Sequence, residues 1–366
     1  MTDLDDLSAI AELDSLDVLG AVEAFPEHCH HAWTLGGQVE DLPDATGIDS
    51  VAVLGMGGSG SAGDVVRAIV EPRLPVPFRV FKDYGPLPEW VGRNTLVLAI
   101  SYSGNTEEVL AALDNAHARG SRLVTISSGG RLAEIAVEYG SAHVSVPTGL
   151  PQPRAALAYL AMPVLAVLAS MGLVPDLGDD VDETVEVCGE IVDRCHRKQP
   201  LADNVAKQIA TTLAGKIPIV YGAAGLGAAA AYRFKCDLNE YAKQPAFASE
   251  LPEANHNEIA GWGVLDDLTT KHFAALIIGE VEEDRRIARR VNVMHELMRD
   301  HFASVTGLTA SGTGEMARLF SLLLIGQLSA IYAGIVNGVD PGPVGAIEDL
   351  KARLARLAQI EEGESP

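Results

Sequence analysis

The sequence predicts an α/β fold in which parallel sheets are covered by helices on both faces, with two such units in one chain. From Asp49 onward, short apolar runs alternate with helical patterns, which is the element order of a parallel sheet. A strand, a glycine turn and a helix return in outline from Ile217. The length of 366 residues and the hydrophobic share of 48% suffice for two buried cores.

The composition limits the partners that the protein can have. Acidic residues outnumber basic ones 50 to 27, which gives a formal net charge of −23. Nucleic acid and anionic membranes repel such a protein, so we expect neither as a partner, and an anionic substrate must be held by local donors. The acidic N-terminal stretch lacks the pattern of a signal peptide, and the four cysteines form no CxxC pair. We therefore expect a cytoplasmic protein with reduced thiols.

Residues 1–45 are expected to form a helical segment with a break at Phe25-Pro26. The run EHCHHAW that follows the break suggests a zinc site at first sight. Consecutive residues on a helix point in different directions, however, and cannot close one tetrahedron without ligands from elsewhere. A partly exposed helix turn is the favoured interpretation.

Residues 46–175 are expected to form the first α/β domain. Its five predicted strands are the runs VAVLGM, FRVFKDY, TLVLAIS, RLVTISS and HVSVP, and a helix is expected from about Ser61 to Val70. In such a parallel sheet the loops that follow the strands meet at the carboxyl edge, where ligands of open α/β sheets bind.

Two of these loops have the composition of a phosphate site. The stretches VAVLGMGGSGSAGD and LVLAISYSGNTEEVL each end a strand in glycines and hydroxyls and then start a helix. Glycines let the backbone approach an anion, and the N–H groups and dipole of the helix point at it. The lysine of a P-loop is missing, so a sugar phosphate is favoured over a nucleoside triphosphate. The candidate phosphate-binding residues are Gly57, Gly58, Ser59, Ser101, Ser103 and Thr106.

A dinucleotide site is the competing interpretation of the first loop. Gly55, Gly57 and Gly60 match the GxGxxG fingerprint, and Asp83 lies where a ribose ligand would be expected. The second loop weakens this interpretation, because a dinucleotide fold does not require its hydroxyls.

A long apolar stretch follows, and Arg154 stands at its start, between rigid or apolar neighbours. An arginine in that position suits an anionic group or an oxyanion that develops during a reaction, although a structural ion pair is the alternative. The stretches 155–175 and 319–336 are apolar enough to raise the question of membrane spans. Pro163 interrupts the first and polar residues the second, so we expect buried helices.

Residues 176–200 are expected to be a helical connector, and residues 201–366 a second α/β domain with C-terminal helices. Its glycine turn, with Gly222, Gly225 and Gly227, lacks the hydroxyls of the first loop, so only the first domain looks suited to phosphate. The expected elements after it are a strand AALIIG, a charged helix from about Glu282 to His301, a strand ASVTG and a long apolar helix.

The second domain also carries candidate acids and bases. Glu240 lies near the end of an alanine-rich helix and suits a general base, and His256 lies in a polar loop that can fix its tautomer. Glu250 and Glu258 are alternative carboxylates, and sequence chemistry alone does not choose among them. Lys351, on the last amphipathic helix, is by itself a weak candidate, because such lysines are usually solvated.

Together these motifs resemble the bifunctional phosphoglucose/phosphomannose isomerases, a branch of the sugar isomerase (SIS) superfamily. The resemblance covers nearly the whole chain and rests on AFPEH, LGMGGSG, SYSGNTEE, PRAALAYL, LNExAK, ELPxxNHNExxGW, and GVDP followed by LK. It implies two SIS domains, each a five-stranded parallel sheet flanked by helices, and a homodimer whose active site lies at the interface. It also implies no metal and no other cofactor.

The resemblance assigns roles to the candidates. Ser59, Ser101, Ser103 and Thr106 would hold the substrate phosphate. Glu240 would move a proton between C1 and C2 through a cis-enediolate, and Arg154 would stabilise that intermediate. His256 would help to open the sugar ring from the partner subunit, and Lys351 would assist at the ring oxygen. The reaction implied is the metal-independent interconversion of glucose 6-phosphate with fructose 6-phosphate, with mannose 6-phosphate as a second substrate.

Two departures from the family pattern are visible. No threonine occurs between Asp340 and Lys351, where one has been linked to mannose activity, and Gln327 stands where an acid is usual. Glucose specificity is therefore expected to dominate. A non-catalytic SIS module that binds a sugar phosphate and regulates a partner is the alternative function, and a nicotinamide enzyme is the third.

Overall fold

The five apolar runs of the first domain form one parallel sheet in the computed structural model of the chain, which describes residues 2–279 and 284–363. The sheet has the order β2-β1-β3-β4-β5, and every neighbouring pair is parallel. The prediction for this sheet is confirmed. Its strands are β1 (Ser50–Leu54), β2 (Phe78–Phe81), β3 (Thr95–Ile100), β4 (Arg122–Ser127) and β5 (Ala142–Ser145).

Helices cover both faces of this sheet because alternate strand residues point to opposite sides. Val51 and Val53 pack into one core with the helices α3, α4 and α7, while Ala52 and Leu54 pack into another with α5 and α6. The bounds of these helices are α3 (Phe25–Gly37), α4 (Gly57–Val70), α5 (Glu107–Ala118), α6 (Gly130–Tyr139) and α7 (Leu157–Ser170). Helix α4 begins at Gly57, so the expected start near Ser61 was too late: the glycines that resembled a loop are its first turn.

The second domain has a parallel sheet of four strands within the described residues, in the order β7-β6-β8-β9. The five strands per sheet that the resemblance implied are therefore found only in the first domain. The sequence also missed β7, because this edge strand, FASEL, is largely solvent-accessible and carries no apolar run. The strands are β6 (Ile217–Ala223), β7 (Phe247–Leu251), β8 (Phe273–Gly279) and β9 (Ser304–Thr309).

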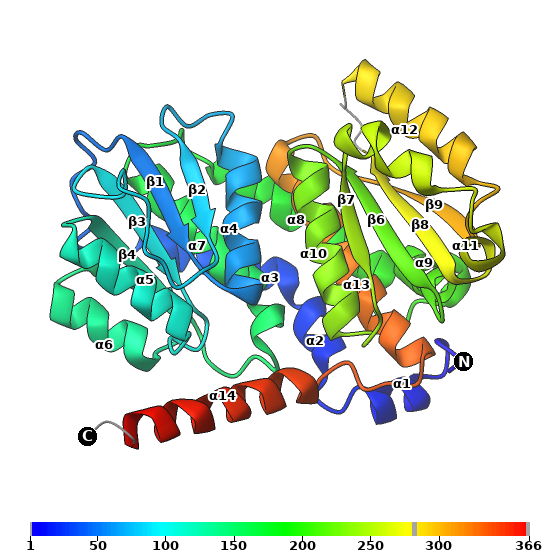
Figure 1. Ribbon diagram of the computed structural model, residues 1–366, viewed down its shortest axis with the longest axis horizontal. Helices are drawn as coiled ribbons and strands as arrows, with labels where there is room; N and C mark the ends of the chain where they lie inside the picture. Colours follow the sequence, from blue (N-terminus) through cyan, green and yellow to red (C-terminus); the bar gives the residue numbers. More distant parts are fainter. Residues whose placement is uncertain (1, 280–283, 364–366) are drawn as a thin grey trace.

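The two sheets share one continuous apolar core, which runs from Val51 and Leu96 in the first domain to Val220 and Leu276 in the second. Figure 1 shows the two domains side by side, with α8 and α13 between and behind them. The remaining helices are α1 (Leu7–Leu13), α2 (Val18–Glu23), α8 (Gly178–Cys195), α9 (Val205–Leu213), α10 (Leu226–Glu240), α11 (Asp266–His272), α12 (Arg285–Met298), α13 (Glu315–Val336) and α14 (Gly345–Gly363). The short 3-10 helices are η1 (Pro153–Ala156), η2 (Leu201–Asp203), η3 (Glu253–His256) and η4 (Glu258–Gly261).

The charged helix α12 and the two long apolar segments can also be compared with their predictions. The predicted helix start at Glu282 lies outside the described residues, and α12 is described from Arg285 onward. The segments 153–170 and 315–336 are long and apolar enough to cross a membrane, but 83% and 100% of their apolar windows are buried inside the fold. They are core helices here, as the sequence predicted.

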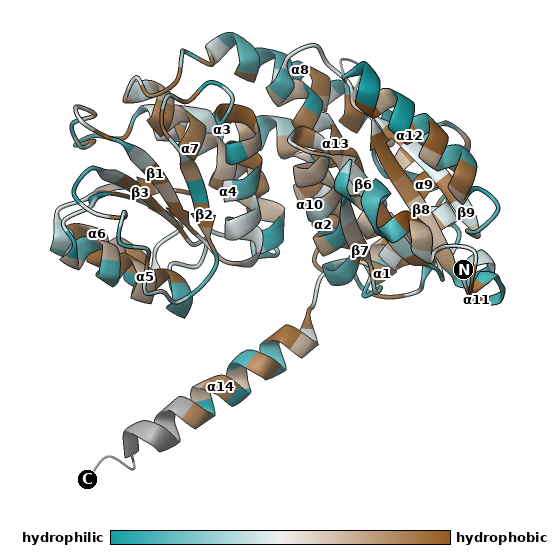
Figure 2. Cartoon of the chain, turned by 45° about the horizontal axis from the view of Figure 1, so that its top comes forward, coloured by the Kyte–Doolittle hydropathy of each residue, from teal (hydrophilic) through white to brown (hydrophobic). Residues whose placement is uncertain are grey.

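Helix α14 differs from the other helices in its surroundings. It leaves the second domain and passes below the first one (Figure 1), and in the view of Figure 2 its coloured part extends away from the two domains. Hydrophobic side chains lie along it, and Leu350, Leu354 and Leu357 are each more than half exposed. Single exposed leucines are common, but a row of them on one helix suggests a contact with another surface.

The glycine turn of the second domain yields a stability prediction. A Cβ atom at Gly222 would lie 2.0 Å from the carbonyl oxygen of Gly227, and both groups are main chain, so neither can move cheaply. We expect Gly222→Ala to lower the free energy of unfolding by roughly 2–4 kcal/mol, because the start of α10 must separate from β6. Urea denaturation measures this.

Gly189 in the middle of α8 is the matched control, since a Cβ atom there meets nothing within 4 Å. Gly189→Ala should leave stability unchanged or raise it by up to about 1 kcal/mol, the helix propensity difference. Equal effects of the two substitutions would contradict the close contact between Gly222 and Gly227.

Candidate active site

One cavity of about 420 Å³ gathers most of the residues that the sequence singled out. The first turn of α4, the loop after β3, η1, the end of α10 and the start of α14 all contribute to its wall. Of the ten candidate residues, those that line it are Gly57, Gly58, Ser59, Ser103, Thr106, Arg154, Glu240 and Lys351. Segments from both domains and from the C-terminal helix therefore meet at one place.

The two loops predicted to bind phosphate form the part of the cavity that belongs to the first domain. Met56, the N-cap of α4, is extended and offers no side-chain cap to the N–H groups of Gly57 and Gly58, which stand at the cavity wall. Gly57 has φ +52°, a left-handed conformation that favours glycine. Ser101 is buried behind the lining, where its hydroxyl lies 2.8 Å from the Thr106 hydroxyl. Ser101 thus supports Thr106 rather than facing the cavity.

Arg154 is buried at the centre of the site, with 3% of its side chain exposed. Its Nη2 atom donates hydrogen bonds to the carbonyl oxygens of Pro341 and Gly342, both at 2.6 Å. Its Nη1 atom lies 3.5 Å from Oε2 of Glu240, and its guanidinium lies over the ring of Tyr241, 4.4 Å from the centroid. The charge is therefore held in a fixed orientation beside the carboxylate.

Glu240 is the last residue of α10, and its side chain is 28% exposed. Its carboxylate lies against the buried arginine at the cavity wall. A carboxylate and a guanidinium side by side suit the removal of a proton from carbon and the stabilisation of the negative charge that results.

A buried polar network under Arg154 was missed by sequence reasoning. Arg233 and Asp237 form an ion pair at 2.8 Å on α10, with side chains that are 3% and 2% exposed. Arg233 also donates to the main-chain oxygen of Arg154 at 2.7 Å. Burial raises the pKa of the Asp237 carboxyl to about 6, and the charge of Arg233 acts against this rise. The spacing of four residues between an arginine and an aspartate was the available signal.

Gln327 belongs to the same network. Its Nε2 atom donates to the hydroxyl of Tyr241 at 2.9 Å and to the main-chain oxygen of Arg154 at 3.3 Å. The departure from the family pattern at this position therefore lies directly behind the site, where an amide supplies a donor that a carboxylate lacks.

Among the candidate catalytic residues, His256 is the one that the structure does not bring to the cavity. It is exposed at the end of η3 and is not among the lining residues. Its loop is anchored, because the hydroxyl of Tyr221 donates to Oε1 of Glu258, and Asn257 Nδ2 donates to Glu253 Oε1 at 3.0 Å. Glu258, one of the alternative carboxylates, is thus engaged in holding this loop.

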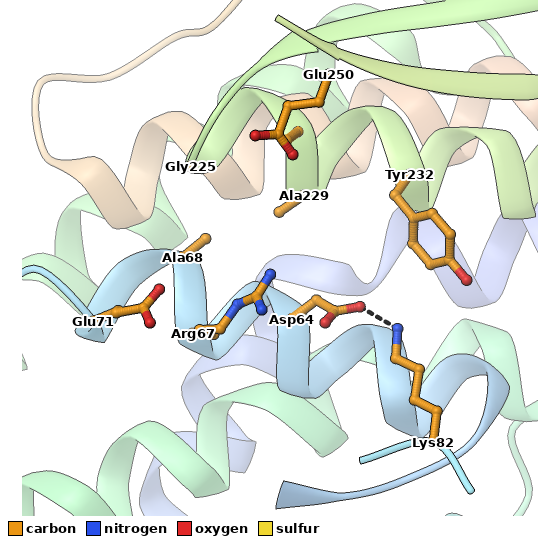
Figure 3. Close-up of a pocket in the computed structure, with 10 residues that line it drawn as sticks. Asp64, Arg67, Ala68, Glu71, Lys82, Gly225, Ala229, Tyr232 and Glu250 are labelled. Atoms are coloured by element: carbon orange, nitrogen blue, oxygen red, sulfur yellow. Dashed lines mark hydrogen bonds and ion pairs between the residues drawn. The ribbon is translucent and has the colours of Figure 1, made fainter. Parts of the chain in front are cut away.

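The other alternative carboxylate, Glu250, lines a different cavity of about 500 Å³ between the domains. Figure 3 shows this cavity, in which Lys82 pairs with Asp64 on α4. Hydroxyl-bearing loops are absent from its described lining, and Asp83 lines neither this cavity nor the one around Glu240. The side chain of Asp83 accepts a hydrogen bond from the backbone N–H of Tyr84 instead.

Three kinds of comparison with known proteins identify the family and the fold of the chain. Residues 47–138 match the SIS domain family, and residues 202–354 match the family described as the bacterial phospho-glucose isomerase C-terminal SIS domain. A bifunctional phosphoglucose/phosphomannose isomerase from Caldicellulosiruptor bescii is 35% identical over 341 residues, which is 92% of this chain and 98% of that protein.

A second relative carries a different name, and a solved structure supports the fold. The D-glucosamine-6-phosphate 4-epimerase of Sulfolobus acidocaldarius is 33% identical over 294 residues, which is 79% of this chain and 87% of that protein. The crystal structure of a hypothetical protein from Thermus thermophilus has a TM-score of 0.72 at 15% identity, covering 98% of this chain and 94% of its own. At that identity it supports the fold alone, and the two family models identify both domains as SIS domains.

The buried ion pair under Arg154 gives a testable prediction. Arg233→Met leaves the Asp237 carboxylate buried without its partner, so we expect the free energy of unfolding to fall by roughly 3–5 kcal/mol. Chemical denaturation near neutral pH measures this loss. The control is Arg131→Met, which breaks the exposed ion pair with Glu138 at 2.6 Å and should hardly move the unfolding midpoint. Equal shifts for both variants would contradict a stabilising role that depends on burial.

Proposed function

Because the chain belongs to the family of bifunctional phosphoglucose/phosphomannose isomerases, we propose that its cavity interconverts D-glucose 6-phosphate with D-fructose 6-phosphate, with D-mannose 6-phosphate as a second substrate. The observation that carries the proposal is the meeting of phosphate loops, Glu240, Arg154 and Lys351 around one cavity. The relatives that cover nearly the whole chain bear the name of this isomerase, which favours an enzyme over a regulatory SIS module.

In the proposed reaction, the first domain holds the phosphate group. The open N–H groups at Gly57 and Gly58 and the hydroxyls of Ser59, Ser103 and Thr106 are donors that need no net positive charge. This suits a protein with a formal net charge of −23, whose overall field repels an anion. A phosphate anchored there places the carbon chain of the sugar toward the second domain.

The proton transfer is assigned to Glu240. Its carboxylate takes the proton from C2 of the aldose, the electron pair of the C–H bond forms the C1–C2 double bond, and the carbonyl oxygen becomes negative. Arg154, 3.5 Å from that carboxylate, stabilises the cis-enediolate. The hydroxyl proton on O2 then passes to O1, the C2–O bond becomes the carbonyl, and Glu240 returns its proton to C1. Lys351 lies in the same wall and would assist at the ring oxygen.

A homodimer with a shared active site is part of the proposal. His256 lies outside the cavity of its own chain, and apolar side chains are exposed near its loop and along α14. Val264 and Leu265 are 81% and 61% exposed. Covering these surfaces with a second copy would allow His256 of each subunit to serve the cavity of the other. We also propose a cytoplasmic location, where the four free cysteines would stay reduced.

The relatives and one sequence motif bear on the reaction and on the choice among sugar phosphates. The relative named as a 4-epimerase covers 79% of this chain, against 92% for the isomerase from C. bescii, so isomerisation is favoured. The absence of a threonine between Asp340 and Lys351 favours glucose over mannose 6-phosphate. An assay that separates the two products decides this point.

Replacing the proposed base tests the reaction. We expect Glu240→Gln to lower kcat about 10²–10⁴-fold, because an amide cannot accept the C2 proton. EDTA-treated protein is given fructose 6-phosphate, and glucose 6-phosphate and mannose 6-phosphate are measured separately, while thermal unfolding checks the fold. Glu250→Gln, the alternative carboxylate in the other cavity, should keep wild-type turnover. Wild-type activity in Glu240→Gln would remove the proposed base.

Subunit complementation tests the shared site. His256→Ala and Glu240→Gln should each be nearly inactive, but mixing them under conditions that exchange subunits should restore about a quarter of wild-type activity, since half of the dimers are mixed and each holds one intact site. The control is each variant taken through the same exchange alone. Mixtures that stay inactive although mixed dimers form would contradict a site shared in this way.

A further inference from the structure

We propose that Lys243 is a positioning residue of this active site, which ties the end of the helix that carries Glu240 to the turn from which α14 carries Lys351 to the same cavity. The proposal rests on the proposed function for its effect on catalysis, but its geometry does not. Lys243 lies three residues after the end of α10 and is not among the residues that line the cavity around Glu240.

The tie consists of two hydrogen bonds from one ammonium group. Nζ of Lys243 donates to the main-chain oxygen of Glu240 at 2.6 Å and to that of Pro341 at 3.2 Å. A lysine near a helix end often caps its last carbonyls, and the first bond alone would do this. The second bond links two segments that are far apart in the sequence. Arg154 donates to the same carbonyl of Pro341, so three elements meet at this oxygen.

The backbone at Lys243 supports a specific role. Its φ is +53°, a left-handed conformation that is costly for a residue with a Cβ atom. Within the described residues, the other non-glycine positions of this kind are Asp17 and Asp41, and aspartate tolerates the conformation far better. A glycine or asparagine would fit position 243 with less strain. Strain of this kind persists where a side chain is required at that point.

The surroundings explain why a tie is needed there. A second cavity, of about 570 Å³, is also lined by Glu240, together with Lys243 and with Val344 and Ile347 at the base of α14. In the view of Figure 2 the coloured part of α14 extends away from the two domains. Packing around the base of α14 is therefore loose, and the direction in which it carries Lys351 depends on how the turn at Pro341 is held.

The ammonium responds to pH close to neutrality. Lys243 as a whole is exposed, but its ammonium group contacts the carbonyl oxygens of Glu240 and Pro341. Desolvation there, followed by the positive charge of Arg154 in η1, lowers the pKa of Lys243 to about 8, while the charges of Asp340 in the turn and Glu240 on α10 act in the opposite direction. The charged form that makes the tie is thus fully present below pH 7 and is lost as the pH rises through 8.

The test uses a substitution that removes the ammonium and relieves the strain together. Lys243→Gly should keep or raise the thermal midpoint, because glycine adopts a positive φ at no cost. We expect its kcat with fructose 6-phosphate to fall about tenfold or more with KM within about twofold of wild type, since misplacement of reacting groups affects the chemical step. The alkaline fall of kcat near pH 8 should disappear in this variant. Lys243→Arg should retain activity and move that fall to higher pH.

A second readout does not depend on activity. Amide hydrogen exchange across residues 340–351 should become about tenfold faster in Lys243→Gly, because the base of α14 opens more often. Unchanged exchange together with unchanged kcat would overturn the proposal, as would a fall in the thermal midpoint that accounts for the whole loss of activity. If the wild-type protein turns over no sugar phosphate, the proposed function fails, and the exchange rates still decide whether the tie exists.

Discussion

A guanidinium buried as deeply as that of Arg154 must find its hydrogen-bond partners inside the protein, and this requirement organises the site. Two carbonyls of the turn at 341–342 accept from it, the ring of Tyr241 lies beneath it, and the carboxylate of Glu240 lies beside it. Its own main-chain oxygen accepts from Arg233. A single charge thus brings η1, α10 and the C-terminal turn into contact, and those are the segments from which the proposed catalytic groups come.

The two domains present opposite ends of a helix to the cavity. In the first domain the cavity meets the start of α4, where the helix dipole and the open N–H groups favour an anion. In the second it meets the end of α10, where the dipole disfavours the carboxylate of Glu240. Arg154 and Lys243 are the cations beside that end, and they offset both the dipole and the carboxylate charge. The positive charge is concentrated beside the proposed base, whereas the loops proposed to bind phosphate offer neutral donors.

Sequence reasoning predicted the first sheet, and it placed the glycine- and hydroxyl-rich loops at the edge where a cavity lies, because these signals are local. An apolar run of five residues followed by glycines and hydroxyls specifies a buried strand and an anion loop whatever surrounds them. The edge strand β7 has no such run, since one side of it is exposed, and it was missed. The start of α4 was placed too late, because glycines that open a helix toward a ligand have the composition of a loop. Both errors come from positions where tertiary context overrides local preference.

The residue types of the candidate site could be predicted from the sequence, but the residues that hold those side chains in place could not. Glu240, Arg154 and Lys351 stand in recognisable motifs, and the structure brings all three to one cavity. Lys243 stands in the same motif as Glu240, yet its contact with Pro341 joins positions about a hundred residues apart, and no spacing rule covers such a pair. Its left-handed backbone is likewise invisible in the sequence, because lysine is an unfavourable residue for that conformation. Residues that hold a catalytic group in place are therefore the part of a site that a sequence reveals least, since their partners are main-chain atoms of any residue type.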